Sequence, residues 1–214
     1  QNLSSSTIQP NQLKDSTQLL NAAMNAKNST ANISAAGSKI NNVSQTIRKS
    51  GDMLAFEGFQ TAMQRASTAG DPLQLTRFVN SASYAANNDA AALNTSFAGL
   101  ARTMGQNDNA LVDGFNKAFT STVEQTGMAG LTAFNKGFAG VEKADYSGSS
   151  VSLTDNLKQY FATANLAATS GKSEEESISN MQRLAKGIEI SENAGDIYKF
   201  FNEFTGPEPE KGFA

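Results

Sequence analysis

The sequence lacks cysteine, histidine and tryptophan altogether. Without cysteine, the chain forms no disulfides and offers neither a thiolate nucleophile nor a thiolate metal site. Histidine is the side chain that titrates near neutral pH and the commonest transition-metal ligand, so its absence disfavours most hydrolytic and metal-dependent mechanisms. We therefore expect no catalytic residue, no enzyme activity, no cofactor and no metal site in this chain.

Charge is scarce as well, because only 17% of the residues are charged, and 17 basic groups against 20 acidic ones give a net charge of -3. The basic residues are scattered, which argues against a nucleic-acid partner. No stretch approaches the ~20 apolar residues of a membrane-spanning helix. Because the chain begins with Gln1 rather than Met, we expect the mature form of a secreted or extracellular protein.

Strand patterns are missing too, since apolar and polar residues nowhere alternate convincingly and the chain holds only six valines. The sequence therefore predicts an all-α multi-helix bundle of six to eight helices. Its 214 residues fit one domain. We expect a flexible segment over residues 1–12, a single helical domain over 13–205 and a flexible, proline-interrupted tail over 206–214.

Helix starts are signalled at several points along the chain. Asp71 followed by Pro72 predicts an N-cap and a first helical residue. Ser152 with Asp155 three residues later resembles a capping box, and Ser173 before three glutamates predicts a further cap at the positive end of a helix dipole. Short helices with one apolar face are expected after each of these signals.

Apolar and small residues recur at steps of three and four along residues 17–50, which is the spacing of a coiled-coil seam. The sequence therefore predicts one long, coiled-coil-like N-terminal helix. Two interpretations of its stripe stay open, packing against other helices of the same domain or contact with a partner chain. The candidate interaction seam consists of Ile33, Ile40, Val43 and Ile47.

Two motifs with known chemistry fail on inspection. The Gly171-Lys172-Ser173 triplet ends like a phosphate-binding loop, but the first glycine of that motif would fall at Leu166. The acidic stretch 107–114 lacks the oxygen ligands and the glycine that a calcium loop requires at its fifth and sixth positions. Neither nucleotide nor calcium binding is expected.

A near-repeat stands out at residues 115–119 and 134–138, which read Phe-Asn-Lys-Ala-Phe and Phe-Asn-Lys-Gly-Phe. Each copy presents a phenylalanine stripe at helical spacing. Gly127 and Gly130 between them favour a chain reversal, so the sequence predicts an αα-hairpin with packed rings. The stripes are interpreted first as core and, in the alternative, as the wall of an apolar ligand cavity made by Phe115, Phe119, Phe134 and Phe138.

These observations lead to two hypotheses of function. The first is a secreted, non-enzymatic helical protein with a structural or assembly role, which self-associates or binds a partner protein through the long heptad-patterned helix. The alternative is a carrier of small apolar, fatty-acid-like ligands in a phenylalanine-lined bundle.

Overall fold

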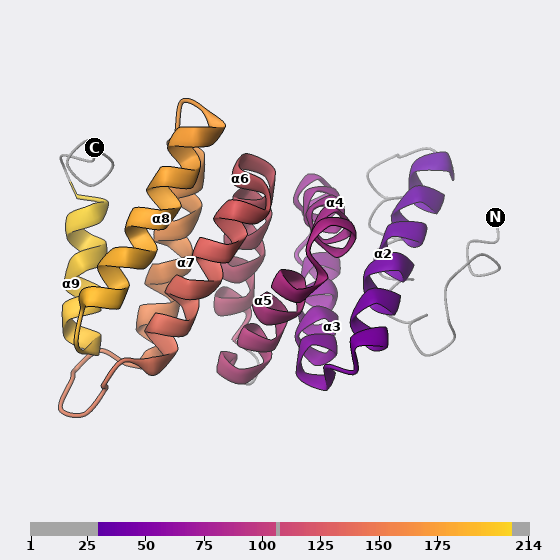
Figure 1. The fold of residues 1–214 in the computed structure, drawn as a ribbon. Helices are drawn as coiled ribbons and strands as arrows, with labels where there is room; N and C mark the ends of the chain where they lie inside the picture. The colour runs from indigo at the N-terminus through magenta and orange to yellow at the C-terminus, as the bar shows by residue number, and fades with distance from the viewer. Residues whose placement is uncertain (1–29, 106–107, 207–214) are drawn as a thin grey trace. The chain divides into compact units, whose positions relative to one another are not determined.

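A computed structural model describes residues 30–105 and 108–206 of the chain. Within these residues eight α-helices, α2 to α9, follow one another (Figure 1). No strand occurs among them, and the only bridge between extended residues that the described part shows is an isolated one joining Asp145 and Asn193. The predicted all-α class and helix number are thus confirmed for the described residues. The predicted end segments lie outside them, except for Gly206.

By their internal contacts, the helices fall into two compact units, residues 1–102 and 103–214. The sequence-based prediction of a single domain over 13–205 stays a prediction, because compactness alone does not establish whether the two units unfold together.

Unit 1 contains four helices, and aspartate side chains cap the starts of the second and third. The side chain of Asp52 accepts a hydrogen bond from Ala55 N (3.0 Å) at the start of the second helix. Asp71 accepts from Leu73 N (3.2 Å) ahead of Pro72, as the sequence predicted. The helices are α2 (Thr30–Ser50), α3 (Met53–Thr68), α4 (Pro72–Asn88) and α5 (Ala90–Thr103), the last ending one residue beyond the unit.

The prediction of a long, coiled-coil-like N-terminal helix is wrong for the described residues. In the described part of the predicted stretch 17–50, α2 has 21 residues and ends at Ser50, before Gly51, whose positive φ of 75° leaves the helical conformation. Residues 17–29 of that prediction lie outside the described residues. The stripe of α2 packs against α4 and α3 of its own unit instead of forming an exposed seam. The longest helical element among the described residues is α6 (Asn109–Lys143), with 35 residues in the middle of the chain.

A ring cluster forms the centre of unit 1. The ring of Phe97, from α5, meets Phe59 of α3 and Phe78 of α4 edge to face, with centroids 5.4 and 6.1 Å apart. α3 and α5 approach closely because Gly58 has no side chain, and an added Cβ would collide with the Phe97 carbonyl oxygen. All three rings are buried.

Unit 2 contains the remaining four helices, and Figure 1 shows α8 and α9 alongside α7. Ser152 and Asp155 form the reciprocal capping box that the sequence indicated. Ser173 accepts from Glu176 N at 3.1 Å and caps the next helix. The helices are α6 (Asn109–Lys143), α7 (Leu153–Thr169), α8 (Glu174–Ile190) and α9 (Ala194–Phe204).

α6 is interrupted at Gly127, whose φ of 62° and ψ of -150° belong to no helix and are accessible essentially to glycine alone. The rings of Phe115 and Phe134, on opposite sides of this break, lie only 6.2 Å apart. In a straight helix, nineteen residues would span about 28 Å. The chain therefore folds back at Gly127, and the predicted αα-hairpin is confirmed by this distance.

The hairpin closes around the core of unit 2. Rings of Phe115, Phe134 and Phe138 contact one another and Phe161 of α7 at centroid distances of 5.2 to 6.3 Å. Tyr160 stacks on Phe134 and donates its hydroxyl proton to the Phe134 carbonyl oxygen at 2.5 Å. The repeated phenylalanines thus hold the two halves of α6 and α7 together.

Candidate functional site

Most of the residues that the sequence singled out lie in the interior. Ile40, Val43 and Ile47 of the candidate seam are between 0% and 3% exposed, which leaves no apolar stripe for a partner. The side chain of Ile33 lies outside the described residues. The four phenylalanines of the alternative ligand wall are at most 2% exposed and fill the space between the helices with their own rings. The structure brings these rings together and places the seam in unit 1.

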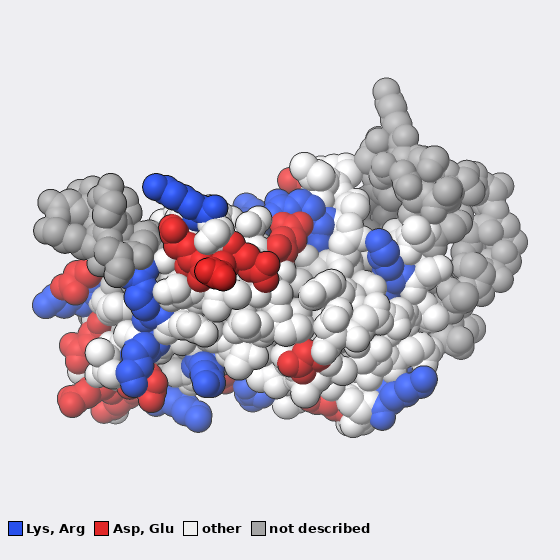
Figure 2. Space-filling model, turned by 45° about the horizontal axis from the view of Figure 1, so that its top comes forward, with Lys and Arg blue, Asp and Glu red and all other residues white. Residues whose placement is uncertain are grey.

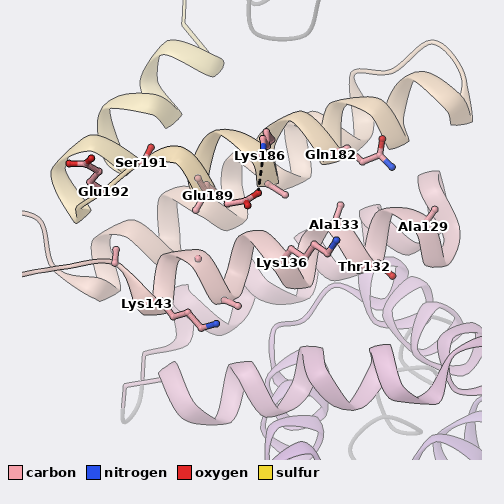
Figure 3. Close-up of a pocket in the computed structure, with 15 residues that line it drawn as sticks. Ala129, Thr132, Ala133, Lys136, Lys143, Gln182, Lys186, Glu189, Ser191 and Glu192 are labelled. Carbon is pink, nitrogen blue, oxygen red and sulfur yellow. Dashed lines mark ion pairs between the residues drawn. The ribbon is translucent and has the colours of Figure 1, made fainter.

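A surface groove runs between the second half of α6 and α8, both in unit 2 (Figure 3). Its volume is about 770 Å³. Figure 3 shows the two helices running the same way along it, with Ala129 and Gln182 at one end and Lys143 and Glu192 at the other. The residues that form its floor and edges come from α6, α8 and the turn after each helix.

The floor of the groove is shaped by small residues. An added Cβ at Gly140 would lie 2.7 Å from Cγ2 of Ile188, so this glycine lets α6 and α8 approach. Ile188 and Ala133 are nearly fully buried and close the floor from below. Because small side chains leave the backbone accessible, a docked chain can come close to both helices. Further small residues in the lining are Ala129, Ala139, Ala144 and Ala185.

The edges of the groove carry exposed charges. Lys136 and Lys143 lie on the α6 edge, seven residues and therefore about two helical turns apart. On the opposite edge Lys186 pairs with Glu189 at 3.6 Å, and their side chains are 69% and 70% exposed. Such an exposed pair contributes little stability, which leaves both partners available for other contacts. Glu192 completes this edge just after α8.

The face seen in Figure 2 carries charges of both signs. Several acidic side chains lie together on it, with basic side chains beside them. Among the described residues no group of three or more acidic side chains could hold a metal ion. The described helices also include none with the length and apolar character that crossing a membrane requires.

Two tyrosines near the groove helices have raised pKa values. Burial raises the pKa of Tyr160 well above its usual value of 10. The pKa of Tyr146, half-buried in the loop after α6, is also raised by burial, and its hydroxyl donates to the Val141 carbonyl oxygen at 2.7 Å. A phenol with a raised pKa stays neutral at physiological pH, so both act as hydrogen-bond donors rather than as bases.

The groove was not predicted from the sequence. The signals that could have pointed to it are the alanines four residues apart at 129 and 133 and the lysines seven apart at 136 and 143. Both patterns are also common on solvated helix faces. Only the packing of α8 beside α6 turns them into one lined surface.

No protein-family model matches the chain, and no curated protein or solved structure matches it either. The geometry of the groove is accordingly the basis for the function proposed below.

Proposed function

We propose that this chain is a non-enzymatic helical protein that works by association, with the groove between α6 and α8 as its contact face. The groove itself carries the proposal. It is open to the surface, has a volume of about 770 Å³, and is bordered by charged side chains of both signs on two helices of one unit. Secretion stays a prediction from the sequence.

Burial of the predicted seam moves the contact face away from α2. An interface requires apolar or complementary side chains that are accessible before binding. Ile40, Val43 and Ile47 are already covered within the chain, whereas the edges of the groove are exposed. Association therefore keeps its place as the leading hypothesis but uses a different surface.

The ligand-carrier hypothesis needs open space beside the repeated phenylalanines. Phe115 instead contacts Phe119, Phe134, Phe138 and Phe161 directly, and each of these rings is buried. None of the phenylalanines lines the groove. These contacts favour core packing for the stripes, and association remains the function that the described geometry supports best.

The floor and the edges of the groove would have separate roles in association. Small residues such as Ala133 and Gly140 allow a partner to approach the helix backbone closely, which favours shape complementarity. Charged edges steer encounter and select the orientation of the partner more than they add affinity. The proposal therefore predicts saturable binding that weakens as the salt concentration rises.

The absence of native cysteine allows a direct test. A benzophenone maleimide is attached to Lys136→Cys on the groove edge, or to Lys117→Cys on the exposed surface of the first half of α6 as a matched control. Each labelled protein is irradiated alone over a concentration series and in an extract of its source cells. We expect a discrete adduct for the groove position and none for the control.

Formation of the adduct must also be sensitive to competition by unlabelled chain. Excess unlabelled wild-type chain should suppress it, whereas chain carrying Lys136→Glu and Lys143→Glu should compete poorly, because the reversed edge repels what the native edge attracts. Equal adducts at both positions, or no saturable adduct at the groove in either setting, would refute association through this face.

A further inference from the structure

Two opposite charges lie on the two edges of the groove at one of its ends. Lys143 is the last residue of α6, and Glu192 follows α8 on the other edge (Figure 3). Both are exposed, and among the described residues neither side chain takes part in a hydrogen bond or an ion pair. Each is therefore an accessible charge beside a surface that already has the form of a docking site.

A second copy of the same chain matches this arrangement by symmetry. When two grooves face each other about a two-fold axis that runs along their length, the α6 edge of one copy lies over the α8 edge of the other. The ends of the grooves stay aligned, so Lys143 of each copy meets Glu192 of its partner. One contact type then forms twice.

The alternative axis, which crosses the groove, brings like edges together. It would place the lysines at 136 and 143 of one copy against the same lysines of the other, where like charges repel. With the axis along the groove, Lys136 of one copy faces Lys186 of the other copy. The charge of that Lys186 is offset by its ion pair with Glu189. Charge complementarity thus selects one of the two arrangements.

Resting on the proposed function, we propose that the occupant of the groove is a second copy of this chain, docked with parallel grooves and held by reciprocal contacts between Lys143 and Glu192. The small floor residues allow close approach of the two faces, and the end charges fix their orientation. The product is a closed, isologous dimer, because each face is used up by its partner.

Charge reversal provides the test, read out by static light scattering of the purified chain over a concentration series. Lys143→Glu places a second carboxylate opposite Glu192, and Glu192→Lys places a second ammonium group opposite Lys143, so each variant alone is repelled at both contacts. Each should raise the dimer dissociation constant about tenfold or more. In an equal mixture, a dimer of one Lys143→Glu chain and one Glu192→Lys chain sets a carboxylate against an ammonium group at both contacts. The mixture should therefore dimerise better than either variant alone, to within about threefold of the wild type.

The double variant that carries Lys143→Glu and Glu192→Lys in one chain should provide a second rescue. Its two copies set opposite charges against each other at both contacts, and it should dimerise to within about threefold of the wild type. The same exchange predicts that the double variant and the wild type pair poorly with each other, since a mixed dimer again joins like charges.

Lys117→Glu is the matched control, since it makes the same charge change on the exposed surface of α6 outside the groove. It should leave wild-type dimerisation unchanged and should fail to rescue Glu192→Lys when both changes are made in one chain. Circular dichroism confirms that every variant is folded before association is measured.

Either of two results would overturn the proposal that a second copy occupies the groove. One is a wild-type chain that stays monomeric at all concentrations, and the other is a double variant that dimerises no better than the single variants. In either case a saturable crosslink from the groove to a different protein would leave the proposed function intact. Loss of both the crosslink and the dimer would remove the proposed function as well.

Discussion

The two near-repeats of α6 differ at one position, where Ala118 in the first corresponds to Gly137 in the second. The tertiary structure explains the difference. An added Cβ at Gly137 would lie 2.5 Å from the hydroxyl oxygen of Tyr160 and 2.9 Å from the edge of its ring. Tyr160 is fully buried and bonded to the Phe134 carbonyl, so it has little room to retreat. Glycine is required there by packing.

Gly137→Ala should therefore destabilise the protein. Overpacking against a buried ring costs about 1–3 kcal/mol, which exceeds the gain of up to about 1 kcal/mol that alanine brings to a helix interior. The control is Gly114→Ala in the same helix, where an added Cβ meets Phe161 at 3.4 Å or more. Urea denaturation should show a lower midpoint for the first variant and an unchanged or higher one for the second. Equal shifts would contradict the packing argument.

The raised pKa of Tyr160 predicts a loss of stability in alkali. Its phenol ionises at about 10 in the unfolded chain but well above that in the folded state, because burial opposes the charge. The contribution of the neutral Tyr160 phenol to the free energy of unfolding is therefore complete below pH 10 and is lost as the pH rises towards the pKa of the folded state. In that window the free energy of unfolding should fall by about 1.4 kcal/mol more per pH unit in wild type than in Tyr160→Phe.

Chemical denaturation at several pH values between about 9 and 11.5 measures this difference. Tyr160→Phe also loses the hydrogen bond to Phe134, which lowers stability at every pH, so the slope rather than the level is compared. Parallel slopes for the two proteins would show that the phenol titrates normally in the folded state.

Among the helices, side chains of α8 supply hydrogen-bond donors to the carbonyl groups at the end of α7. The last carbonyl groups of a helix have no donor within it. In α7, the Ala168 carbonyl oxygen accepts from Ser177 Oγ at 2.8 Å, and the Ala167 carbonyl oxygen accepts from Asn180 Nδ2 at 3.0 Å. Both donors come from α8 and are buried, which makes these polar residues part of the core.

Asn180→Ala should consequently destabilise unit 2 more than an ordinary polar substitution. It leaves the Ala167 carbonyl without its donor inside the protein, at a cost of about 1–3 kcal/mol. Ser179→Ala is the control, because Ser179 is exposed on the same turn of α8. Thermal unfolding followed by circular dichroism gives the comparison. A cost no larger than that of the control would mean that water replaces the lost donor.

For the whole molecule, we expect a substitution in the core of unit 1 to change stability without changing association. Ile47 is fully buried in unit 1, so Ile47→Val should lower the free energy of unfolding by about 0.5–1.5 kcal/mol through the lost methyl group. Because Ile47 lies outside the groove, we expect the dimer dissociation constant to stay unchanged. Light scattering of the folded variant measures this. A marked rise in that constant would restore α2 as the contact element.

Hydrogen exchange on the same variant also tests the domain organisation. Ile47 belongs to unit 1, whose rings form a cluster of their own, so we expect reduced protection in residues 30–102. Equal loss of protection in unit 2 would instead support the single domain over 13–205.

Local chemistry made much of the fold predictable. Asp71 before Pro72, Ser152 with Asp155, and Ser173 before its glutamates fix helix starts through short-range hydrogen bonds, and the structure shows them at these positions. The reversal at Gly127 was predictable for the same reason, since it depends on the conformational freedom of a single residue. The all-α class followed from helical periodicity and the lack of strand patterns.

What the sequence determined by itself was therefore the class, the starts of α4, α7 and α8, and the hairpin of α6, because these depend on residues close together in the chain. The tertiary structure alone decided that the α2 stripe is buried in its own unit, that α8 supplies the donors for α7, and that α6 and α8 enclose a groove. A periodic stripe specifies that a helix has a partner but not which helix covers it, since burial is non-directional and many faces of similar shape compete for it.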